Sequence, residues 1–408
     1  MRRPAQTPVT IAYAAFGLLG VNAGVSGVLL VAQMSYYSVD RATIGITFFT
    51  GTAGFVLAGS TAGAYINRFG FRVALAIGGG GFVLAGLYTA TRPPFVAFAI
   101  LQVLTGFAAG VHESVLNSYI TTLPNATAQL NRLHAFFGAG ALVGPPLATW
   151  IVSHASWTTV WLVLGLAYIP LTVAFLIAYP RHGPDADAAA PRPAEPASSG
   201  LLLTALRQRG IVLGAVLLAV YVGLEAAMGN WGFSYLMQDR GLDGLLAGYT
   251  VSGYWLGLTV SRLLISPVAA RMKSTALGTM YACMAGVIAA AALIWLLPAA
   301  AAASAGFVLV GFFLGPIFPT TMAVAPRLTT AALVPTAIGV MNVGSVVGAS
   351  ALPWLAGTVA QTTGMWILLP FVLILGLLQL GLLRSMAQSF GAGAGSQVPA
   401  VPDAPPSL

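Results

Sequence analysis

Two glutamates, Glu113 and Glu225, lie inside stretches that are otherwise apolar enough to cross a membrane. The other acidic residues, of nine in all, fall in expected loops, at loop ends or near the C-terminus. A carboxyl group in a low dielectric has its charged form disfavoured and can bind and release a proton, so such a residue usually has a function. We expect Glu113 to carry a proton, and Glu225 to carry a second one or to hydrogen-bond a bound molecule. The alternative for both is a permanently protonated side chain that bonds a neighbouring helix.

Two histidines lie in the same kind of stretch. His112 points about 100° away from Glu113 around a helix, so adjacency does not make the two residues a pair. His134 lies near the expected start of a helix, where a histidine often bonds backbone groups, although intramembrane histidines also relay protons. Because no HExxH or similar ligand spacing occurs, we expect no metal site and no cofactor.

Uncharged polar residues follow helical spacing around the two glutamates. One polar stripe begins at Asn22, a second contains Glu113, and a third contains Glu225. Aromatic rings near the third stripe offer faces on which a sugar ring can stack, although Trp and Tyr also gather at membrane interfaces. The candidate solute-binding residues are Asn22, Gln33, Gln102, Asn117, Tyr221, Trp231, Tyr254 and Trp255.

The composition places most of the chain in a membrane. Of the 408 residues, 58% are hydrophobic and only 6% are charged, with a mean hydropathy of +0.88. A soluble domain has about 25% charged residues, and one membrane crossing needs about 20 apolar residues. The runs are too long for barrel strands, so the crossings are predicted to be helices. We expect twelve of them, over residues 10–35, 43–66, 71–91, 94–122, 133–153, 157–179, 209–237, 243–266, 275–297, 301–325, 333–359 and 365–385.

The net charge of +8 is distributed as a topology signal. With the N-terminus in the cytoplasm, only Arg41, Arg92 and Arg240 of the 17 basic residues lie on the outer side. Both termini are therefore expected in the cytoplasm, and the basic excess contacts lipid headgroups rather than nucleic acid. The inner-side basic residues are Arg2, Arg3, Arg68, Arg72, Arg132, Arg181, Arg192, Arg207, Arg209, Arg262, Arg271, Lys273, Arg327 and Arg384.

A polar segment divides the chain into two sets of six crossings. Residues 180–200 are rich in Pro, Ala and charge and poor in aromatics, which is typical of a flexible linker. We expect an N-terminal six-helix half over 1–179, a cytoplasmic linker over 180–208, a C-terminal six-helix half over 209–385 and a disordered tail over 386–408.

The two halves carry traces of an internal repeat. Gly20 and Asn22 match Gly223 and Glu225 at one offset. At the same or nearly the same offset, the further matches are Met34 with Met237, Arg68 with Arg271, Gly106 with Gly311, and Gly140 with Gly344. These matches favour a six-plus-six duplication, and transporters with such halves bind solute near the midplane between the repeats.

The segment after the second expected crossing carries a loop motif. Residues 63–72 (GAYINRFGFR) resemble the Gly-x3-Asp-Arg-x-Gly-Arg-Arg motif of the major facilitator superfamily. Asn67 stands at the acidic position and Phe71 at a basic one, which implies a weaker latch on the cytoplasmic face. The candidate gating residues are Gly63, Asn67, Arg68, Gly70 and Arg72. The resemblance covers essentially the whole membrane region and implies an all-α fold of twelve transmembrane helices in two six-helix pseudo-repeats.

Within that superfamily, the chain is similar to the fucose–proton and glucose/galactose symporter branch. Glu113 and Asn117 follow that branch's Glu-x3-Asn pattern in the fourth helix. The resemblance implies that helices 1, 4, 7 and 10 line a central cavity. The branch often has an acid on helix 1, but here Asn22 occupies the repeat position of Glu225 and cannot titrate.

Three functions fit these features to different degrees. The first is proton-coupled uptake of a sugar-like, neutral polar solute by alternating access. The alternative is proton-driven efflux of drug-like or amphipathic compounds, because Gly140, Gly144 and Pro145 resemble the fifth-helix motif of drug–proton antiporters. An enzyme or sensor lacks support, since no cluster of nucleophile, base or metal ligands and no soluble domain is evident. We expect a monomeric, multi-pass protein of a bacterial inner membrane.

Overall fold

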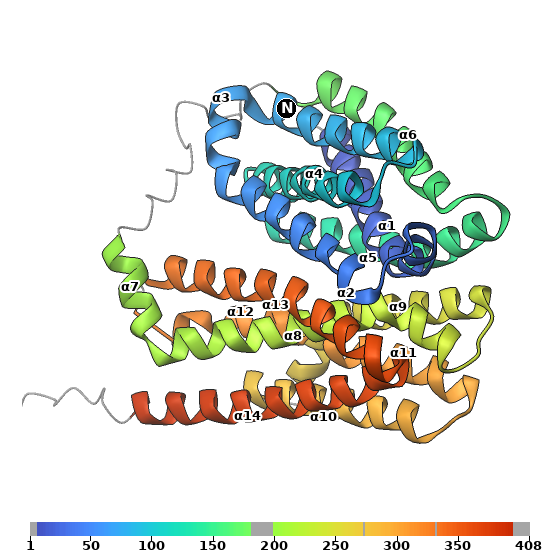
Figure 1. Ribbon diagram of the computed structural model, residues 1–408. Helices are drawn as coiled ribbons and strands as arrows, with labels where there is room; N and C mark the ends of the chain where they lie inside the picture. Colours follow the sequence, from blue (N-terminus) through green and yellow to red (C-terminus); the bar gives the residue numbers. More distant parts are fainter. Residues whose placement is uncertain (1–5, 181–198, 272–273, 331–332, 395–408) are drawn as a thin grey trace, which may run out of the picture.

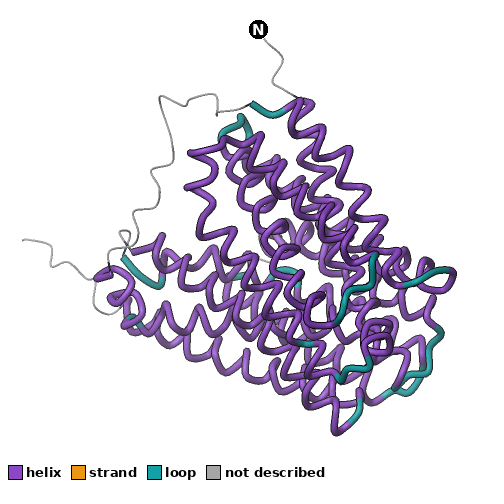
Figure 2. The backbone as a smooth tube through the Cα atoms, turned by 45° about the horizontal axis from the view of Figure 1, so that its top comes forward, coloured by secondary structure: helices purple, strands orange, loops and turns teal. Residues whose placement is uncertain are grey.

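The structure is a computed structural model that describes residues 6–180, 199–271, 274–330 and 333–394. The described chain is helical almost throughout (Figures 1 and 2), so the expected all-α class is confirmed. The N-terminal bundle consists of α1 (Gln6–Tyr37), α2 (Arg41–Ile44), α3 (Ile46–Ala90), α4 (Phe95–Thr121), α5 (Ala126–His154) and α6 (Trp157–Ala178). After α7 (Ser199–Arg207), the C-terminal bundle consists of α8 (Arg209–Gln238), α9 (Gly244–Arg271), α10 (Ala276–Leu296), α11 (Ala300–Leu314), α12 (Ile317–Val324), α13 (Val334–Thr363) and α14 (Leu368–Ala394).

Ten helical stretches of the described chain are long and apolar enough to cross a membrane. One of them, Arg41–Ala90, has 50 residues, far more than the roughly 20 that one crossing needs. It bends at Gly70, whose φ of 74° and ψ of 172° are a conformation that glycine adopts most readily. The segments expected over 43–66 and 71–91 therefore lie on the two arms of α3. The segment expected over 243–266 lies on α9, which is not among the ten stretches.

Within each bundle, small residues let the corresponding pairs of helices pack closely together. Gly140 of α5 lies so near α1 that an added Cβ would overlap a backbone carbonyl there. Gly348 of α13 lies in the same way on the carbonyl of Ala219 in α8. Gly106 packs α4 on α3, and Gly311 packs α11 on α9. The glycine spacings that suggest an internal repeat thus line matching interfaces, as expected where small residues let membrane helices approach closely.

Replacing Gly140 with alanine is expected to destabilise the protein. The added Cβ overlaps backbone atoms of α1, so the helices must separate to accommodate it. We expect a loss of about 1–3 kcal/mol, typical of overpacking, seen as a lower melting temperature of the purified protein. Gly80→Ala is the matched control, because nothing lies within 4 Å of its added Cβ and alanine favours a helix. Equal melting temperatures for the two variants would contradict this packing.

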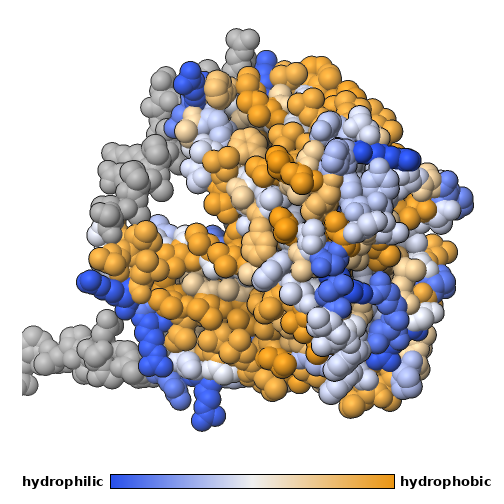
Figure 3. Space-filling model, in the orientation of Figure 1, coloured by the Kyte–Doolittle hydropathy of each residue, from blue (hydrophilic) through white to orange (hydrophobic). Residues whose placement is uncertain are grey.

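The two bundles touch at one end and part at the other. At the joined end, the Arg41 side chain donates to Gln238 of α8 at 2.8 Å and to Gln361 of α13 at 3.2 Å. Trp354 Nε1 donates to the carbonyl of Ala42 at 3.2 Å. Figure 3 shows the surface hollowed between the bundles beside α7, at the opposite end. The structure is therefore closed at the end that holds α2 and open at the end that holds α7.

Two segments that were expected to be a flexible linker and a disordered tail are helical in part. Ser199–Arg207 is helical inside the range expected to be a flexible linker, because Ala205 is buried where α7 packs against α8 and α13. α14 continues past residue 385 because Met386 is buried and extends the apolar side of the helix. The rest of the expected linker and tail, 181–198 and 395–408, lies outside the described residues.

Loss of the Arg41 side chain is expected to loosen the closed end. Arg41→Ala removes two hydrogen bonds between the bundles, each from a charged donor. Such bonds contribute about 1.5–3 kcal/mol when buried, and partial exposure lowers this value. We expect a roughly fivefold population shift toward a conformation that is open at this end. Double electron–electron resonance between spin labels at the exposed Ile46 and Thr362 checks the shift.

The matched control for this measurement is Arg132→Ala, which removes an exposed arginine at the start of α5. Cys283 is replaced by alanine throughout, so that the labels attach only at the introduced cysteines. If the Arg41 variant and the control give the same distance distribution, the Arg41 contacts do not hold this end closed.

Candidate functional site

A cluster of charged and phenolic side chains lies between α8 and α9. Tyr221 donates a hydrogen bond to Oε2 of Glu225, one turn away near the middle of α8. Arg262 of α9 places Nη2 3.4 Å from the same oxygen. Tyr254 of α9 donates to the backbone carbonyl of Glu225 at 3.0 Å. The side chains of Glu225 and Arg262 are 17% and 37% exposed, so the two charges neutralise each other while staying accessible.

Arg262 also caps a break in a neighbouring helix. The break between α11 and α12 falls at Gly315 and Pro316, and Pro319 follows one turn later. Because Pro319 has no N–H, the carbonyl of Gly315 lacks its helical donor. Nε of Arg262 donates to this carbonyl at 3.3 Å. A single side chain therefore connects Glu225 on α8 to the break between α11 and α12.

Arg262 does not lie where the charge pattern predicts it. The charge pattern predicts it at the inner ends of the helices, but its contact with Glu225 sets it level with the middle of α8. The sequence does contain a signal, because Arg262 is the sole charged residue between Gly244 and Ala270. A charge in so apolar a run points to a functional site. Sequence reasoning missed it because an arginine also fits the inner-side excess of basic residues.

His134 faces this cluster from the other bundle. It is exposed on α5, and the ring of Phe16 meets it edge-to-face with 5.4 Å between centroids. About one turn from each residue, Gly138 of α5 packs on the Thr259 side chain of α9, which sets His134 opposite Arg262. In the same interface, Ser252 donates to the carbonyl of Leu142 at 2.5 Å. His134 therefore lies in the field of Arg262.

Over the described residues, no three His, Cys, Asp or Glu side chains group as a metal site requires.

Glu113 lies half-buried on α4 in the N-terminal bundle. Asn117, expected to bond its carboxyl group or a solute, donates instead to the backbone carbonyl of Glu113 at 2.8 Å. Within the described residues, the Glu113 carboxyl group has no hydrogen-bond or ion-pair partner. The exposed Val96 and Ile100 mark the side of α4 that faces away from the bundle, and helical geometry places Glu113 on a different side of the helix. The structure does not join Glu113 to Glu225, which belongs to the other bundle.

His112 belongs to the packed interior of the N-terminal bundle. Its side chain is fully buried, and Nδ1 lies 2.9 Å from a backbone carbonyl of its own helix. The rings of Phe82, Tyr168 and Phe175 surround it, with centroids 5.4–5.7 Å away. This environment supports a structural histidine rather than a partner of Glu113.

A small cavity in the N-terminal bundle brings together two expected solute-binding residues. Asn22 of α1 and Gln102 of α4 line it, with Thr89, Thr105 and Trp161 beside them. Nε1 of Trp161 is buried with no acceptor among the described residues. The cavity is large enough for a single water molecule and too small for a sugar. In this conformation, Asn22 and Gln102 therefore contribute to a water-sized site.

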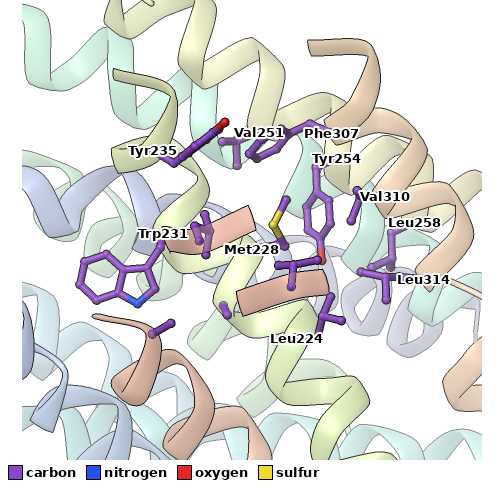
Figure 4. Packing of buried hydrophobic residues seen from close by; sticks show 14 of the residues in the cluster. Leu224, Met228, Trp231, Tyr235, Val251, Tyr254, Leu258, Phe307, Val310 and Leu314 are labelled. Carbon is purple, nitrogen blue, oxygen red and sulfur yellow. The ribbon is translucent and has the colours of Figure 1, made fainter. Parts of the chain in front are cut away.

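The remaining expected solute-binding residues are dispersed. Gln33 is buried in α1. Trp231 is fully buried, and its Nε1 donates to the carbonyl of Pro353 at 2.7 Å. Tyr254 is fully buried on another side of α8 (Figure 4). Trp255 is half-buried, and its Nε1 has no acceptor in the described part of the chain. Of these three aromatic residues, only Trp255 is partly exposed.

The loop motif is held to its own bundle. Nε of Arg72 donates to the carbonyl of Tyr179 at the end of α6, at 2.7 Å. Gly63, Asn67 and Arg68 are exposed. The described residues show no hydrogen bond or ion pair from Asn67 or Arg68 to the C-terminal bundle. This arrangement agrees with bundles that are apart at this end.

Several curated proteins are similar to the chain. It is 25% identical to "Bypass of stop codon protein 6" of Saccharomyces cerevisiae, over 86% of this chain and 76% of that protein. It is 28% identical to the gallate transporter of Pseudomonas putida, over 37% of this chain and 35% of that protein. It is 30% identical to the glucose/galactose transporter of Brucella abortus, over 40% of this chain and 42% of that protein.

Solved structures share the fold at low sequence identity. The nucleoside transporter NupG superposes with a TM-score of 0.77 at 13% identity, over 94% of this chain and 98% of that one. A bacterial homolog of the human lysosomal transporter Spinster, in an inward-facing and unoccupied conformation, superposes with a TM-score of 0.77 at 12% identity, over 96% of this chain and 99% of that one.

A family model described as Major Facilitator Superfamily matches residues 12–353, which is most of the chain. This match confirms the resemblance to the superfamily that the loop after the second crossing suggests. The chain belongs to the Major Facilitator Superfamily, and it is an integral, multi-pass membrane transporter of small solutes and not an enzyme.

Proposed function

We propose that this transporter takes up a sugar-like, neutral polar solute together with protons, by alternating access in a bacterial inner membrane. The observation that carries the proposal is Glu113, a half-buried carboxyl group without a partner in the described chain, on the inward-turned side of α4. A carboxyl group in this position can gain or lose a proton without breaking an ion pair.

A count of twelve crossings supports the proposed architecture. To the ten apolar stretches we add one for the second arm of α3 and one for α9, which makes twelve. An even count puts both termini on one side, and the basic residues favour the cytoplasm. The proposed halves are residues 1–179 and 209–385, with the linker (180–208) and the tail (386–408) on the same side.

The arrangement of the bundles supports alternating access. With the termini inside, the end held by Arg41 faces outward and the hollow beside α7 faces the cytoplasm. Uptake then requires the outer contacts to break while the inner ends come together. The short side-chain hydrogen bonds at the outer end can be exchanged for water at little net free energy.

The charges of the site support a neutral solute. Glu225 and Arg262 compensate each other, so this part of the site has no net charge while both are ionised. Trp255 adds a partly exposed aromatic ring, although its Nε1 is buried. A sugar ring offers C–H faces that can stack on such a ring.

Proton-driven efflux of amphipathic compounds is the second candidate. Its support in the sequence is the fifth-helix run Gly140, Gly144 and Pro145. In the structure both glycines pack α5 directly against α1. Helix packing therefore accounts for this run, so the structure adds no support for efflux, whereas Glu113 can serve proton coupling in either direction.

Glu113→Gln is expected to abolish proton-driven accumulation while sparing exchange of solute across the membrane. Glutamine keeps the size and hydrogen-bonding groups of the side chain but cannot titrate. The measurement uses purified protein in liposomes, with and without an imposed pH gradient. Ser118→Ala is the control, because it removes a polar group of the same helix that bonds only the backbone carbonyl of Ser114. Accumulation by Glu113→Gln at the wild-type level would exclude this role.

Transport assays separate uptake from efflux. Cells that express the protein are expected to accumulate a labelled hexose several-fold above cells that carry the Glu113→Gln variant, and a proton uncoupler should remove the difference. Extrusion of a fluorescent amphipathic dye should be equal in the two strains. Faster dye extrusion by the wild-type strain without hexose accumulation would favour the efflux candidate instead.

A further inference from the structure

We propose that α7 lies in the surface of the membrane, with its leucines among the lipid chains and the arginines beside it on anionic phospholipid headgroups. This makes α7 an interaction surface at the open end of the C-terminal bundle, and its partner is a bilayer that contains acidic phospholipid. The proposal needs only that the bundles cross a membrane, so it does not rest on the proposed solute or on coupling to protons.

The sequence of α7 gives it an apolar side and a polar side. Leu201, Leu202, Leu203 and Leu206 make up four of its nine residues. At 100° per residue, the last three of them lie within an arc of about 100° on the helix surface. Thr204 lies about 150° from the middle of this arc. Such a division is typical of a helix that lies along the interface between lipid and water.

The leucines of α7 remain exposed in the folded chain. Their exposed fractions are 41–51%, although the helix is held against the protein on another side. On that side Ala205 is buried with Ile211 of α8 and Ala337 of α13. Figure 3 shows a hydrophobic surface over α7 next to a hydrophilic band at the end of the C-terminal bundle. Large apolar side chains gathered in this way mark an interaction surface.

The position of α7 fits the boundary between lipid and water. Figure 1 shows it running across the ends of the C-terminal helices, level with the start of α13. The apolar stretch of α13 that is long enough to cross a membrane begins there, at Val334. Gln208 is extended, with φ −82° and ψ 113°, so the chain turns between α7 and α8. A helix in this plane can insert its apolar side without crossing the bilayer.

The charges around α7 are complementary to an anionic surface. Arg207 ends α7, Arg209 begins α8, and both are exposed. The exposed Arg327 lies at the same end, because an added Cβ at Gly210 would meet the carbonyl of Leu328. Arginines at a membrane surface attract acidic lipid headgroups. The acidic residues of the described chain lie away from this end, and they are Asp40, Glu113, Glu225, Asp239 and Asp243.

Spin labels test where the leucines lie. Leu202→Cys, Leu206→Cys and Thr204→Cys are made singly with Cys283→Ala, and the labelled protein is placed in nanodiscs of phosphatidylcholine and phosphatidylglycerol. The labels at the two leucine positions should be reached by oxygen, which dissolves in lipid, several-fold better than by a water-soluble nickel chelate. The label at the threonine position is the matched control, and it should show the reverse preference.

Two other results of this measurement would overturn the proposal. Better access of nickel than of oxygen at all three positions would mean that α7 stands in water. Poor access of both reagents at the leucine positions would mean that the N-terminal bundle covers the leucines, as a gate at this end would. Neither result depends on a solute or a proton gradient, so both are distinguishable from a failure of the proposed uptake.

The headgroup chemistry is tested by titrating detergent-purified protein with phosphatidylglycerol or phosphatidylcholine and following its melting temperature, since a ligand of the native state stabilises it. Phosphatidylglycerol should raise the melting temperature more. The double variant Arg207→Gln, Arg209→Gln should need about fivefold or more phosphatidylglycerol for half of this shift. Arg92→Gln, which removes an exposed arginine at the opposite end, should keep the wild-type midpoint. Equal stabilisation by both lipids, or an unchanged midpoint in the double variant, would overturn the anionic partner.

Discussion

Hydrocarbon offers no hydrogen bonds, and this constraint shapes the rest of the structure. A backbone group or a charge within the membrane is costly unless the protein supplies a partner for it. The break between α11 and α12 leaves the carbonyl of Gly315 without its helical donor, and an isolated Arg262 would be an uncompensated cation. Their contact, together with Glu225, removes both problems at once. The site exists where two costly features satisfy each other, which explains why an arginine is stable there.

Close packing occurs both within the bundles and between them. Gly140 and Gly348 let backbones meet directly inside each bundle, so these interfaces cannot shift without opening gaps. Between the bundles, an added Cβ at Gly27 of α1 would overlap the carbonyl of Gly229 in α8, and Arg41 adds side-chain hydrogen bonds at the closed end. Water can replace these hydrogen bonds, whereas it cannot replace close backbone packing. Rocking of one bundle on the other therefore has to separate α1 from α8 at Gly27 as well as break the Arg41 contacts.

Hydropathy was sufficient to predict the helices, and isolated charge was sufficient to single out Glu113 and Glu225, whose roles stay predictions. What the sequence could not supply is the partner of each polar group. Helical spacing puts Asn117 one turn from Glu113, but the amide reaches the nearer backbone carbonyl. Trp231 is aromatic and lies close to Glu225 in the chain, yet it fills a gap against α13. An arginine at position 262 agrees both with the excess of basic residues on the inner side and with a functional charge in an apolar run. Only its contacts in the folded structure decide between these two interpretations.

The two acids are chemically different because of their partners. Asn22 and Glu225 occupy repeat-related positions, so the C-terminal bundle has a charge where the N-terminal bundle has an amide. Protonation of Glu113, which is unpaired within the described chain, neutralises a lone negative charge. Protonation of Glu225 instead uncovers the positive charge of Arg262. The first change removes a charge that is costly in a low dielectric, and the second leaves a cation without its counter-ion. The same chemical event thus has opposite electrostatic consequences in the two bundles, and neither acid can replace the other.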